Sequence, residues 1–413
     1  MNQFTVLFLV LLGLTSALKL WLAHRHAAFV MANRDRVPQQ FAEKIPLESH
    51  QKAADYTRAK VNLSSLSVVL DVMVLLAFTL GGGIGWLDGL WRERLGEGLG
   101  SGVAIIASVI LIAAFIDLPF SLYRTFNLEA RFGFNKMTLK LFLGDLIKQG
   151  LLAVAIGLPI VLAVLWMMER LGNRWWLYAW FAWSAFNLFL LAVYPTWIAP
   201  LFNKFTPLDN AELKARIERL LQKCGFQSSG LFVMDGSLRS SHANAYFTGF
   251  GKTKRVVFFD TLLNSLTGNE IEAVLAHELG HFKRRHVIKR IVLTLVGSFV
   301  FLWLLAQLMH APWFFSGLGV ERPSTALALI LFFLALPVFT YLLHPLMSYY
   351  SRKQEFEADE YAAQQADARD LVSALVKLYK DNASTLTPDP LHSAFYDSHP
   401  PAAARIEKLL AAS

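Results

Sequence analysis

The chain has 413 residues, of which 55% are hydrophobic and only 17% charged, and its mean hydropathy is +0.41. A soluble domain carries about 45–50% apolar and about 25% charged residues, so this composition indicates a membrane protein. The single cysteine, Cys224, excludes an intramolecular disulfide and a cysteine-rich zinc finger. A bound metal would therefore need His, Asp and Glu ligands.

Seven hydrophobic runs are long enough to cross a bilayer, which requires roughly 20 apolar residues. In chain order they lie near 4–23, 65–88, 101–123, 149–168, 175–198, 291–309 and 324–349. The first run is a poor signal peptide, because such a peptide begins with a basic segment and no Lys or Arg precedes Lys19. Only a few residues around ERLGNR separate the fourth and fifth runs, which predicts a helical hairpin.

The basic residues are divided unevenly between the loops. Residues 24–62, 124–148, 199–290 and 350–413 together hold 33 Lys and Arg, whereas the loops on the opposite side hold 5. Because cytoplasmic loops carry the excess of Lys and Arg, the N-terminus is expected outside and the C-terminus in the cytoplasm. The net charge of +8 then reflects topology, and nucleic-acid binding is not expected.

Four polar side chains fall inside the expected spans: Asp71, Asp117, Asn187 and His344. Ionisable residues at membrane depth usually face the interior of a helix bundle or a wet cavity. Two interpretations stay open at this point. The four residues form interhelical hydrogen bonds at the ends of spans, or they line an internal aqueous chamber.

The long loop at 199–290 is mixed in character. Its stretch 208–225 has the pattern of an amphipathic helix that ends at Gly225. The stretches GLFVMDG (230–236) and KRVVFFDTLL (254–263) have the pattern of short strands. This loop is therefore expected to fold as a small α+β unit.

A second helix is expected toward the end of this loop. Thr267 and Glu270 have the spacing of a capping box, and Leu266 and Ile271 have the spacing of a hydrophobic staple. These signals place the start of the helix near Gly268.

His277 and His281 lie well inside this helix, one turn apart on one face. At that spacing both imidazoles can reach one ion, as in the zinc-binding H-E-x-x-H motif. Glu278 lies about 100° round the helix, where it can reach a metal-bound water without being a ligand. A zinc ion lowers the pKa of that water to about 7, and Glu278 would take its proton and pass it to a leaving amine. The alternative is a charged helix face with incidental histidines.

A catalytic zinc also needs a third protein ligand and an open fourth position. After the seventh run, SRKQEFEADEYAAQ (351–364) offers Glu355, Glu357 and Asp359. Glu355 and Asp359 share one helix face. The alternative here is an ordinary solvated acidic helix.

These motifs resemble those of a known family, the integral-membrane zinc metalloproteases called CAAX prenyl protease type 1. The family motif H-E-L-G-H matches 277–281, and its later motif E-[FY]-x-A-D matches 355–359. Further stretches similar to family blocks, in family order, are 118–138, 194–208, 239–263 and 398–406. The resemblance extends over nearly the whole chain, and the C-terminal helices, rich in Ala and Gln, suggest a bacterial member.

The resemblance implies a role for each matching residue. The ligands of one Zn²⁺ per chain would be His277, His281 and Glu355, and Glu278 would be the general base. Asp359 would orient a ligand histidine. His286 matches a family histidine without an assigned role.

The resemblance also implies how a peptide is held. Asn244 and Ala245 would lie on an edge strand that binds extended substrate backbone. In HANAYFTGF (242–250), alternation puts Asn244, Tyr246 and Thr248 on one face and Ala243, Ala245 and Phe247 on the other. His399 would stabilise the oxyanion of the tetrahedral intermediate, with Arg405 beside it in contact with substrate.

The resulting fold class is an all-α membrane protein whose seven transmembrane helices enclose a chamber, with a zincin-like α+β metalloprotease domain on the cytoplasmic side. The expected divisions are helices 1–5 at 1–198, the metalloprotease domain at 199–290, helices 6 and 7 at 291–349, and a C-terminal cytoplasmic segment at 350–413. In a bacterium the chain would lie in the inner membrane. The sequence does not indicate an oligomeric state or a route for substrate entry.

The leading functional prediction is a zinc endopeptidase whose substrate is a peptide or protein, with a prenyl group or without one. The family removes the C-terminal tripeptide of prenylated CAAX proteins and makes an upstream cut in some substrates. One alternative is a quality-control protease for membrane proteins, because a bacterium need not offer a prenylated substrate. An alternative of another class is a seven-span transporter or channel with a structural metal. A structural site, however, needs neither Glu278 nor an open position on the metal.

Overall fold

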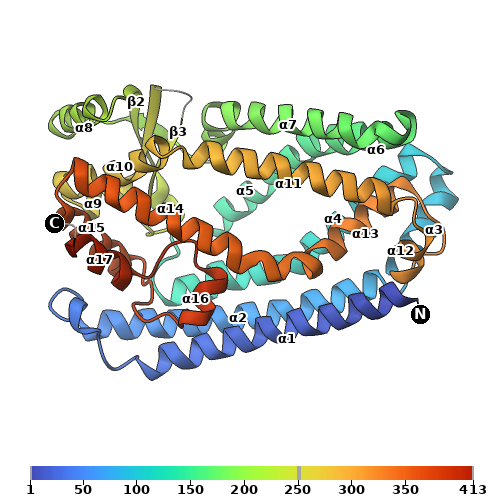
Figure 1. Ribbon diagram of the computed structural model, residues 1–413, viewed down its shortest axis with the longest axis horizontal. Helices are drawn as coiled ribbons and strands as arrows, with labels where there is room; N and C mark the ends of the chain where they lie inside the picture. The colour runs from blue at the N-terminus through green and yellow to red at the C-terminus, as the bar shows by residue number, and fades with distance from the viewer. Residues whose placement is uncertain (1, 249–252, 412–413) are drawn as a thin grey trace.

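The structure is a computed structural model that describes residues 2–248 and 253–411. Most of these residues are helical, and the long helices run side by side along the longest axis of the molecule (Figure 1). The helices are α1 Gln3–Ala32, α2 Leu47–Phe78, α3 Gly83–Leu95, α4 Leu99–Tyr123, α5 Leu139–Leu152, α6 Leu158–Arg170, α7 Trp175–Val193, α8 Ala211–Lys223, α9 Asp260–Ser265, α10 Gly268–Lys283, α11 His286–Leu308, α12 Pro312–Gly317, α13 Thr325–Thr340, α14 His344–Gln365, α15 Ala368–Asp381, α16 Pro390–Tyr396 and α17 Ala402–Ala411.

Seven helical segments of the described chain are long and apolar enough to cross a membrane, as predicted. They are Gln3–Ala32, Leu47–Phe78, Leu99–Glu129, Leu139–Arg170, Gly172–Leu201, His286–Leu308 and Thr325–Gln365. Two of them, Leu139–Arg170 and Thr325–Gln365, join two α-helices through a short π-helical or 3₁₀ turn, and α6 and α7 form the expected hairpin. Most of the segments continue beyond the apolar runs by two or more turns, so that the helices extend past the part that a bilayer would cover.

The prediction for the second run was wrong at its C-terminal end. The run at 65–88 appeared to be one span, but α2 ends at Phe78 and 83–95 forms a separate helix, α3. Three consecutive glycines, Gly81 to Gly83, lie between them, and Gly82 has a φ of +77°, in the left-handed region that favours glycine. The helix is therefore broken at the glycines, and α2 gains its length at the other end, where it begins at Leu47.

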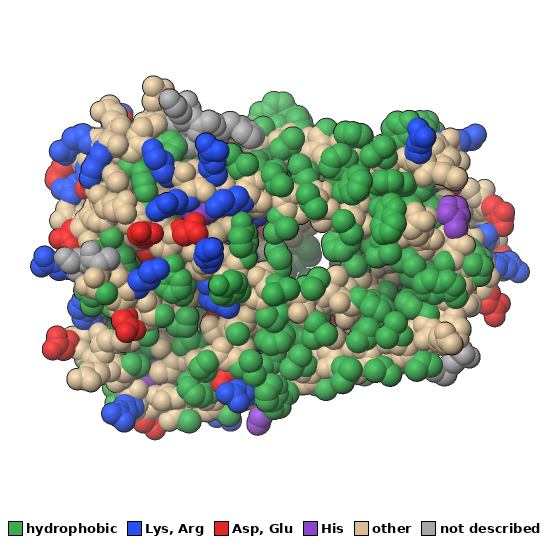
Figure 2. All heavy atoms as spheres, in the orientation of Figure 1, with side chains coloured by type: hydrophobic (Ala, Val, Ile, Leu, Met, Phe, Trp, Pro, Cys, Tyr) green, Lys and Arg blue, Asp and Glu red, His purple; other side chains and the backbone are tan. Residues whose placement is uncertain are grey.

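The helices surround an interior space. Figure 2 shows an opening among the hydrophobic side chains near the middle of one face. Asp71, Asp117 and His344 lie in the spans yet are exposed rather than buried against other helices. Because ionisable groups at membrane depth need water or a partner, their exposure favours an aqueous chamber over the interhelical hydrogen bonds that were the alternative for these three. Asn187 differs, since its side chain bonds the carbonyl of Trp183 in its own helix.

A small α/β unit occupies the end of the molecule opposite the N-terminus (Figure 1). Its strands are β1 Phe205–Pro207, β2 Gln227–Met234, β3 Ala245–Thr248 and β4 Thr253–Phe259, in the order β1-β2-β4-β3. The central pair β2 and β4 is parallel, and the outer strands are antiparallel to their neighbours. Strand β3 therefore lies at an edge of the sheet. The helix predicted at 208–225 and the strand predicted at 230–236 are confirmed as α8 and β2. The strand predicted at 254–263 is confirmed only as far as Phe259, where β4 ends, and the next residues form α9.

One apolar core joins this unit to the C-terminal helices. It includes side chains of α8, the sheet, α10, α15 and α17. Ala243, Ala245 and Phe247 all belong to it or pack against it, which confirms that they share the inward face predicted from the alternation. The core therefore fixes the edge strand and the histidine-bearing helix relative to each other.

Candidate active site

Helix α10 begins where the sequence signals placed it. The Thr267 side chain accepts a hydrogen bond from the Glu270 N–H, and the Glu270 carboxylate accepts one from the Thr267 N–H, so both halves of the capping box are formed. The same carboxylate also binds Ser373 and Lys377 of α15. The cap thus anchors α10 against α15 and so helps to fix the position of the helix that carries the histidines.

Helix α10 packs closely against α14, and Gly280 makes this possible. A Cβ atom at this position would lie 3.0 Å from both the Cα and the carbonyl oxygen of Ala358. Since real Cβ atoms essentially never approach backbone more closely, a larger residue would push the two helices apart. The glycine inside the H-E-L-G-H motif therefore lets α10 and α14 pack closely enough to bring Glu355 within reach of the histidines.

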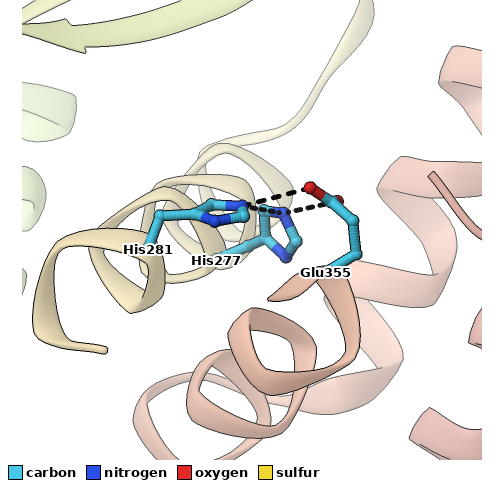
Figure 3. Close-up of side chains that lie close together, drawn as sticks. All are labelled: His277, His281 and Glu355. Atoms are coloured by element: carbon cyan, nitrogen blue, oxygen red, sulfur yellow. Dashed lines mark hydrogen bonds and ion pairs between the residues drawn. The ribbon is translucent and has the colours of Figure 1, made fainter. Parts of the chain in front are cut away.

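The two histidines and Glu355 meet between these helices, and their polar atoms point toward one another (Figure 3). The two Nε2 atoms are 3.3 Å apart, and each lies 3.4 Å from an oxygen of the Glu355 carboxylate. One ligand atom from each of the three residues lies within 4.8 Å of the others. The predicted acidic helix therefore supplies its side chain to the same point in space as the predicted histidine pair.

The three residues fit a divalent metal. Glu355 is buried, and its Oε2 atom has no hydrogen-bond partner among the described residues. A buried carboxylate oxygen without a donor is costly unless a cation meets it. Two imidazoles and one carboxylate are also the donor set of many catalytic zinc sites, which leave a fourth position open.

His277 is held on its far side by a buried pair. Its Nδ1 lies 2.8 Å from Asp359, and Arg405 donates two hydrogen bonds, of 2.8 and 2.6 Å, to the same carboxylate. Burial alone would lower the pKa of His277, but the hydrogen bond to Asp359 and the nearby Glu355 carboxylate raise it to about 9. The site therefore stabilises positive charge at His277 Nε2, whether a proton or a metal ion supplies it.

His281 is backed by a second chain of hydrogen bonds that the sequence did not reveal. Its Nδ1 lies 3.0 Å from Nδ1 of His286, and Nε2 of His286 lies 3.0 Å from Glu357. Burial, with a contribution from the charge on His277, lowers the pKa of His281 to about 4. His281 is thus neutral near pH 7, the state that a metal ligand requires.

Glu278 and His399 face the same small pocket as His277. This pocket, of about 120 Å³, is also lined by Asn244, Ala245 and Arg405. Burial raises the pKa of the Glu278 carboxyl, which brings it toward the range of a general base at neutral pH. His399 Nε2 lies 3.5 Å from Glu355, and the His399 side chain is 61% exposed.

The structure therefore brings together every residue that the sequence singled out as a site candidate. Two of them have partners that were not expected. Arg405 was predicted to contact substrate, and its guanidinium bonds Asp359, although it also lines the pocket. The Asn244 side chain accepts a hydrogen bond from the N–H of Ala245 on the edge strand.

Comparison with known proteins assigns both halves of the chain. Residues 26–204 match the family model of the CAAX prenyl protease N-terminal region with five membrane helices, and residues 207–413 match peptidase family M48. A CAAX prenyl protease 1 homolog of Arabidopsis thaliana is 35% identical over 381 residues and covers 90% of each chain. CAAX prenyl protease 1 of Saccharomyces cerevisiae is 33% identical, over 91% of this chain and 88% of the relative.

Among solved structures, the crystal structure of S. mikatae Ste24p aligns with a TM-score of 0.90 at 30% identity, over 99% of each chain. The family matches, the relatives and this fold agree with the site geometry. The chain therefore belongs to peptidase family M48, among the CAAX prenyl proteases, and is a multi-pass membrane metalloprotease.

Proposed function

We propose that this chain is a zinc endopeptidase in which His277, His281 and Glu355 hold one Zn²⁺ and Glu278 is the general base. The observation that carries the proposal is the convergence of these three ligand atoms beside Glu278, a half-buried glutamate that is not one of them. Zinc, when bound, polarises the scissile carbonyl and lowers the pKa of its water. Membership of a peptidase family argues against the transporter or channel that the sequence left as an alternative.

The protein's own groups then perform the remaining work. Glu278 takes a proton from the attacking water and delivers it to the nitrogen of the leaving amine, so that the carboxylate is regenerated. Its raised pKa suits both steps, since a carboxylate of ordinary pKa would be a weak base and would hold the proton poorly. His399, on the open side of the pocket, donates to the oxygen that becomes negative in the tetrahedral intermediate.

The substrate backbone would lie along β3, with Asn244 and Ala245 beside the scissile bond. Asn244 keeps its amide NH₂ group for the peptide while its oxygen accepts from Ala245. Arg405 acts mainly through Asp359, which it neutralises and orients, and Asp359 in turn fixes the ring of His277.

For the substrate class, we infer a peptide or protein that carries a C-terminal CAAX sequence, because the relatives are named as CAAX prenyl proteases. A prenyl chain would find apolar walls inside the helical bundle. The loops rich in Lys and Arg would face the cytoplasm, together with the active site. Cleavage of unmodified membrane proteins is the second candidate from the sequence, and the same assay separates the two.

The test is a cleavage assay with purified protein in detergent on three peptides. Two share one CAAX sequence and differ only in a farnesyl group on the cysteine, and the third lacks the CAAX end. A zinc-dependent cut that requires the farnesyl group supports prenyl processing. Comparable cuts in all three support the broader protease, and no cut before or after zinc addition would contradict both.

A further inference from the structure

The edge strand β3 gives the bound peptide a direction. One side of β3 pairs with β4, and no other strand of the described residues pairs with its second side, which can add an extended peptide. Antiparallel pairing is the more stable arrangement. A peptide bound in this way passes its C-terminal residues toward the beginning of β3, along Asn244, Ala243 and His242.

A larger cavity begins at that end of the strand. It measures about 630 Å³, within the roughly 300–1,000 Å³ typical of ligand sites. Ala243 and Asn244 line both this cavity and the small pocket that contains His277 and Glu278. The larger space, which we call the C-terminal cavity, therefore adjoins the small pocket at Ala243 and Asn244, on the side toward which the residues after the scissile bond would run.

The C-terminal cavity is lined by both apolar and basic side chains. Met234, Phe259 and Tyr56 offer apolar wall, and the basic side chains are Lys60, Arg239 and His242. Arg239 is already neutralised, because it donates two hydrogen bonds to Asp145. It is therefore poorly available to an incoming anion.

His242 is also occupied. Its Nδ1 lies 3.2 Å from the Asn382 amide oxygen, and its Nε2 lies 3.7 Å from Glu129. The Glu129 carboxylate accepts a further hydrogen bond from the Tyr56 hydroxyl. Glu129, the acidic group beside His242, therefore already has two partners, His242 and Tyr56.

Lys60 differs from these two. Its Nζ lies over the ring of Tyr56, 4.1 Å from the ring centre, and no Asp or Glu carboxylate of the described residues lies within 4.0 Å of it. The side chain is exposed, and it lines the C-terminal cavity. Glu129 is the carboxylate whose charge acts on Lys60, but it makes no ion pair with it. An ammonium group that faces a cavity with no carboxylate within ion-pair distance is suited to bind an anion.

We propose that the C-terminal cavity receives the last residues of the substrate and that Lys60 binds a carboxylate there. The proposal rests on the proposed peptidase function and adds a determinant of specificity. Three extended residues span about 10 Å, which suits a cavity of this size next to the scissile bond. The same carboxylate chemistry comes from a free C-terminus or from an acidic side chain, and the experiment separates these sources.

The experiment compares one CAAX peptide as the free acid and as the C-terminal amide, with wild type and Lys60→Met. In wild type, amidation should lower kcat/KM by about 10-fold or more, the usual effect of a lost charge-assisted hydrogen bond. In Lys60→Met, the ratio between acid and amide should fall close to one, while Lys60→Arg should keep most of it. A third peptide is a C-terminal amide whose last residue is Asp. If its kcat/KM returns to that of the free acid, a side-chain carboxylate is sufficient. If its kcat/KM stays low, the ligand of Lys60 is the free C-terminus.

The matched control is Lys52→Met. Lys52 lies on the same helix, and its Nζ also lies over an aromatic ring, that of Phe134, but it does not line the cavity. This variant should keep the wild-type ratio. An equal rate for acid and amide in wild type, or an unchanged ratio in Lys60→Met, would overturn the proposal. Failure of the peptidase function is distinct, since it would appear as no zinc-dependent cleavage of either peptide.

Discussion

The chain from His281 through His286 to Glu357 should determine how tightly zinc is held. If His281 binds the metal through Nε2, its Nδ1 must carry the proton and donate it to His286 Nδ1, 3.0 Å away. His286 must then carry its own proton on Nε2, from which it donates to Glu357, also at 3.0 Å. The geometry thus fixes the tautomer of both rings, and His286→Ala removes the acceptor on which this order depends.

The expected loss of zinc affinity can be judged from the His281 Nδ1–H, which is left without an acceptor. In His286→Ala, the Nδ1–H of His281 loses its acceptor at a place with little access to water, because His281 is 16% exposed and His286 only 2%. A partly buried donor without a partner costs about 1–3 kcal/mol. Loss of a group that orients a metal ligand usually weakens metal binding by about 10- to 100-fold, or about 1.4–2.7 kcal/mol. We therefore expect the zinc dissociation constant to rise within this range.

The assay is competition for zinc against a chelator of known affinity, with protein purified in detergent, so that the readout does not depend on turnover. His286→Asn is the matched variant, because its amide oxygen stands at the same number of bonds from Cα as Nδ1 and can accept the same hydrogen bond. It should recover most of the affinity. Glu357→Gln should lose little, since Gln still accepts from His286 Nε2.

A dissociation constant for His286→Ala within twofold of wild type would refute this reasoning. A His286→Asn protein that binds zinc as weakly as the alanine variant would also refute it, because the missing acceptor would then not be the cause.

Asp359→Asn is a less clean test of ligand orientation. It leaves Arg405 buried with its partner's charge removed, and breaking such a pair costs about 3–5 kcal/mol of stability on its own.

Three other variants and one topology probe test the rest of the site. Glu278→Gln should keep zinc and fold but lose nearly all turnover, and single-turnover cleavage near the wild-type rate would exclude the base role. Glu355→Ala should lose most of its zinc by metal analysis, whereas full occupancy would remove Glu355 from the ligand set. His399→Ala should lower kcat by about 100-fold or more with a smaller change in KM, and a kcat within twofold of wild type would count against the oxyanion role. In a Cys224→Ser background, a cysteine added at Lys52 should resist labelling from outside the cell, and strong labelling would reverse the topology.

Local signals in the sequence were sufficient for the histidine-bearing helix. Its capping box lies within four consecutive residues, and the spacing of His277 and His281 follows from helix geometry alone. The three consecutive glycines after α2 are a turn signal in the sequence, but the apolar run continues across them. Hydrophobicity alone therefore predicted one continuous span where the chain forms two helices.

The contacts behind the ligands do not follow from local sequence patterns, because each depends on packing between distant segments, and Asp359 was assigned only through the family resemblance. His286 and Glu357 are 71 residues apart, and Asp359 and Arg405 are 46 apart. Nothing local distinguishes Glu357 from its acidic neighbours on α14. Only the angle at which α14 meets α10 and the start of α11 directs Glu355 to the metal position and Glu357 to His286.

The hydrogen-bonded groups behind His281 and behind His277 differ in how deeply they are buried. The one behind His281 joins α11 to α14 and ends at Glu357, whose side chain is 30% exposed. The one behind His277 ends at Arg405, which α17 delivers as a buried cation 6% exposed. An arginine is buried at little cost only when its carboxylate partner is in place. His277 and Arg405 together hold the pKa of the Asp359 carboxyl below its usual range despite burial. Helix α17 is thus a structural component of the active site, because through Arg405 and Asp359 it helps to hold the ring of His277.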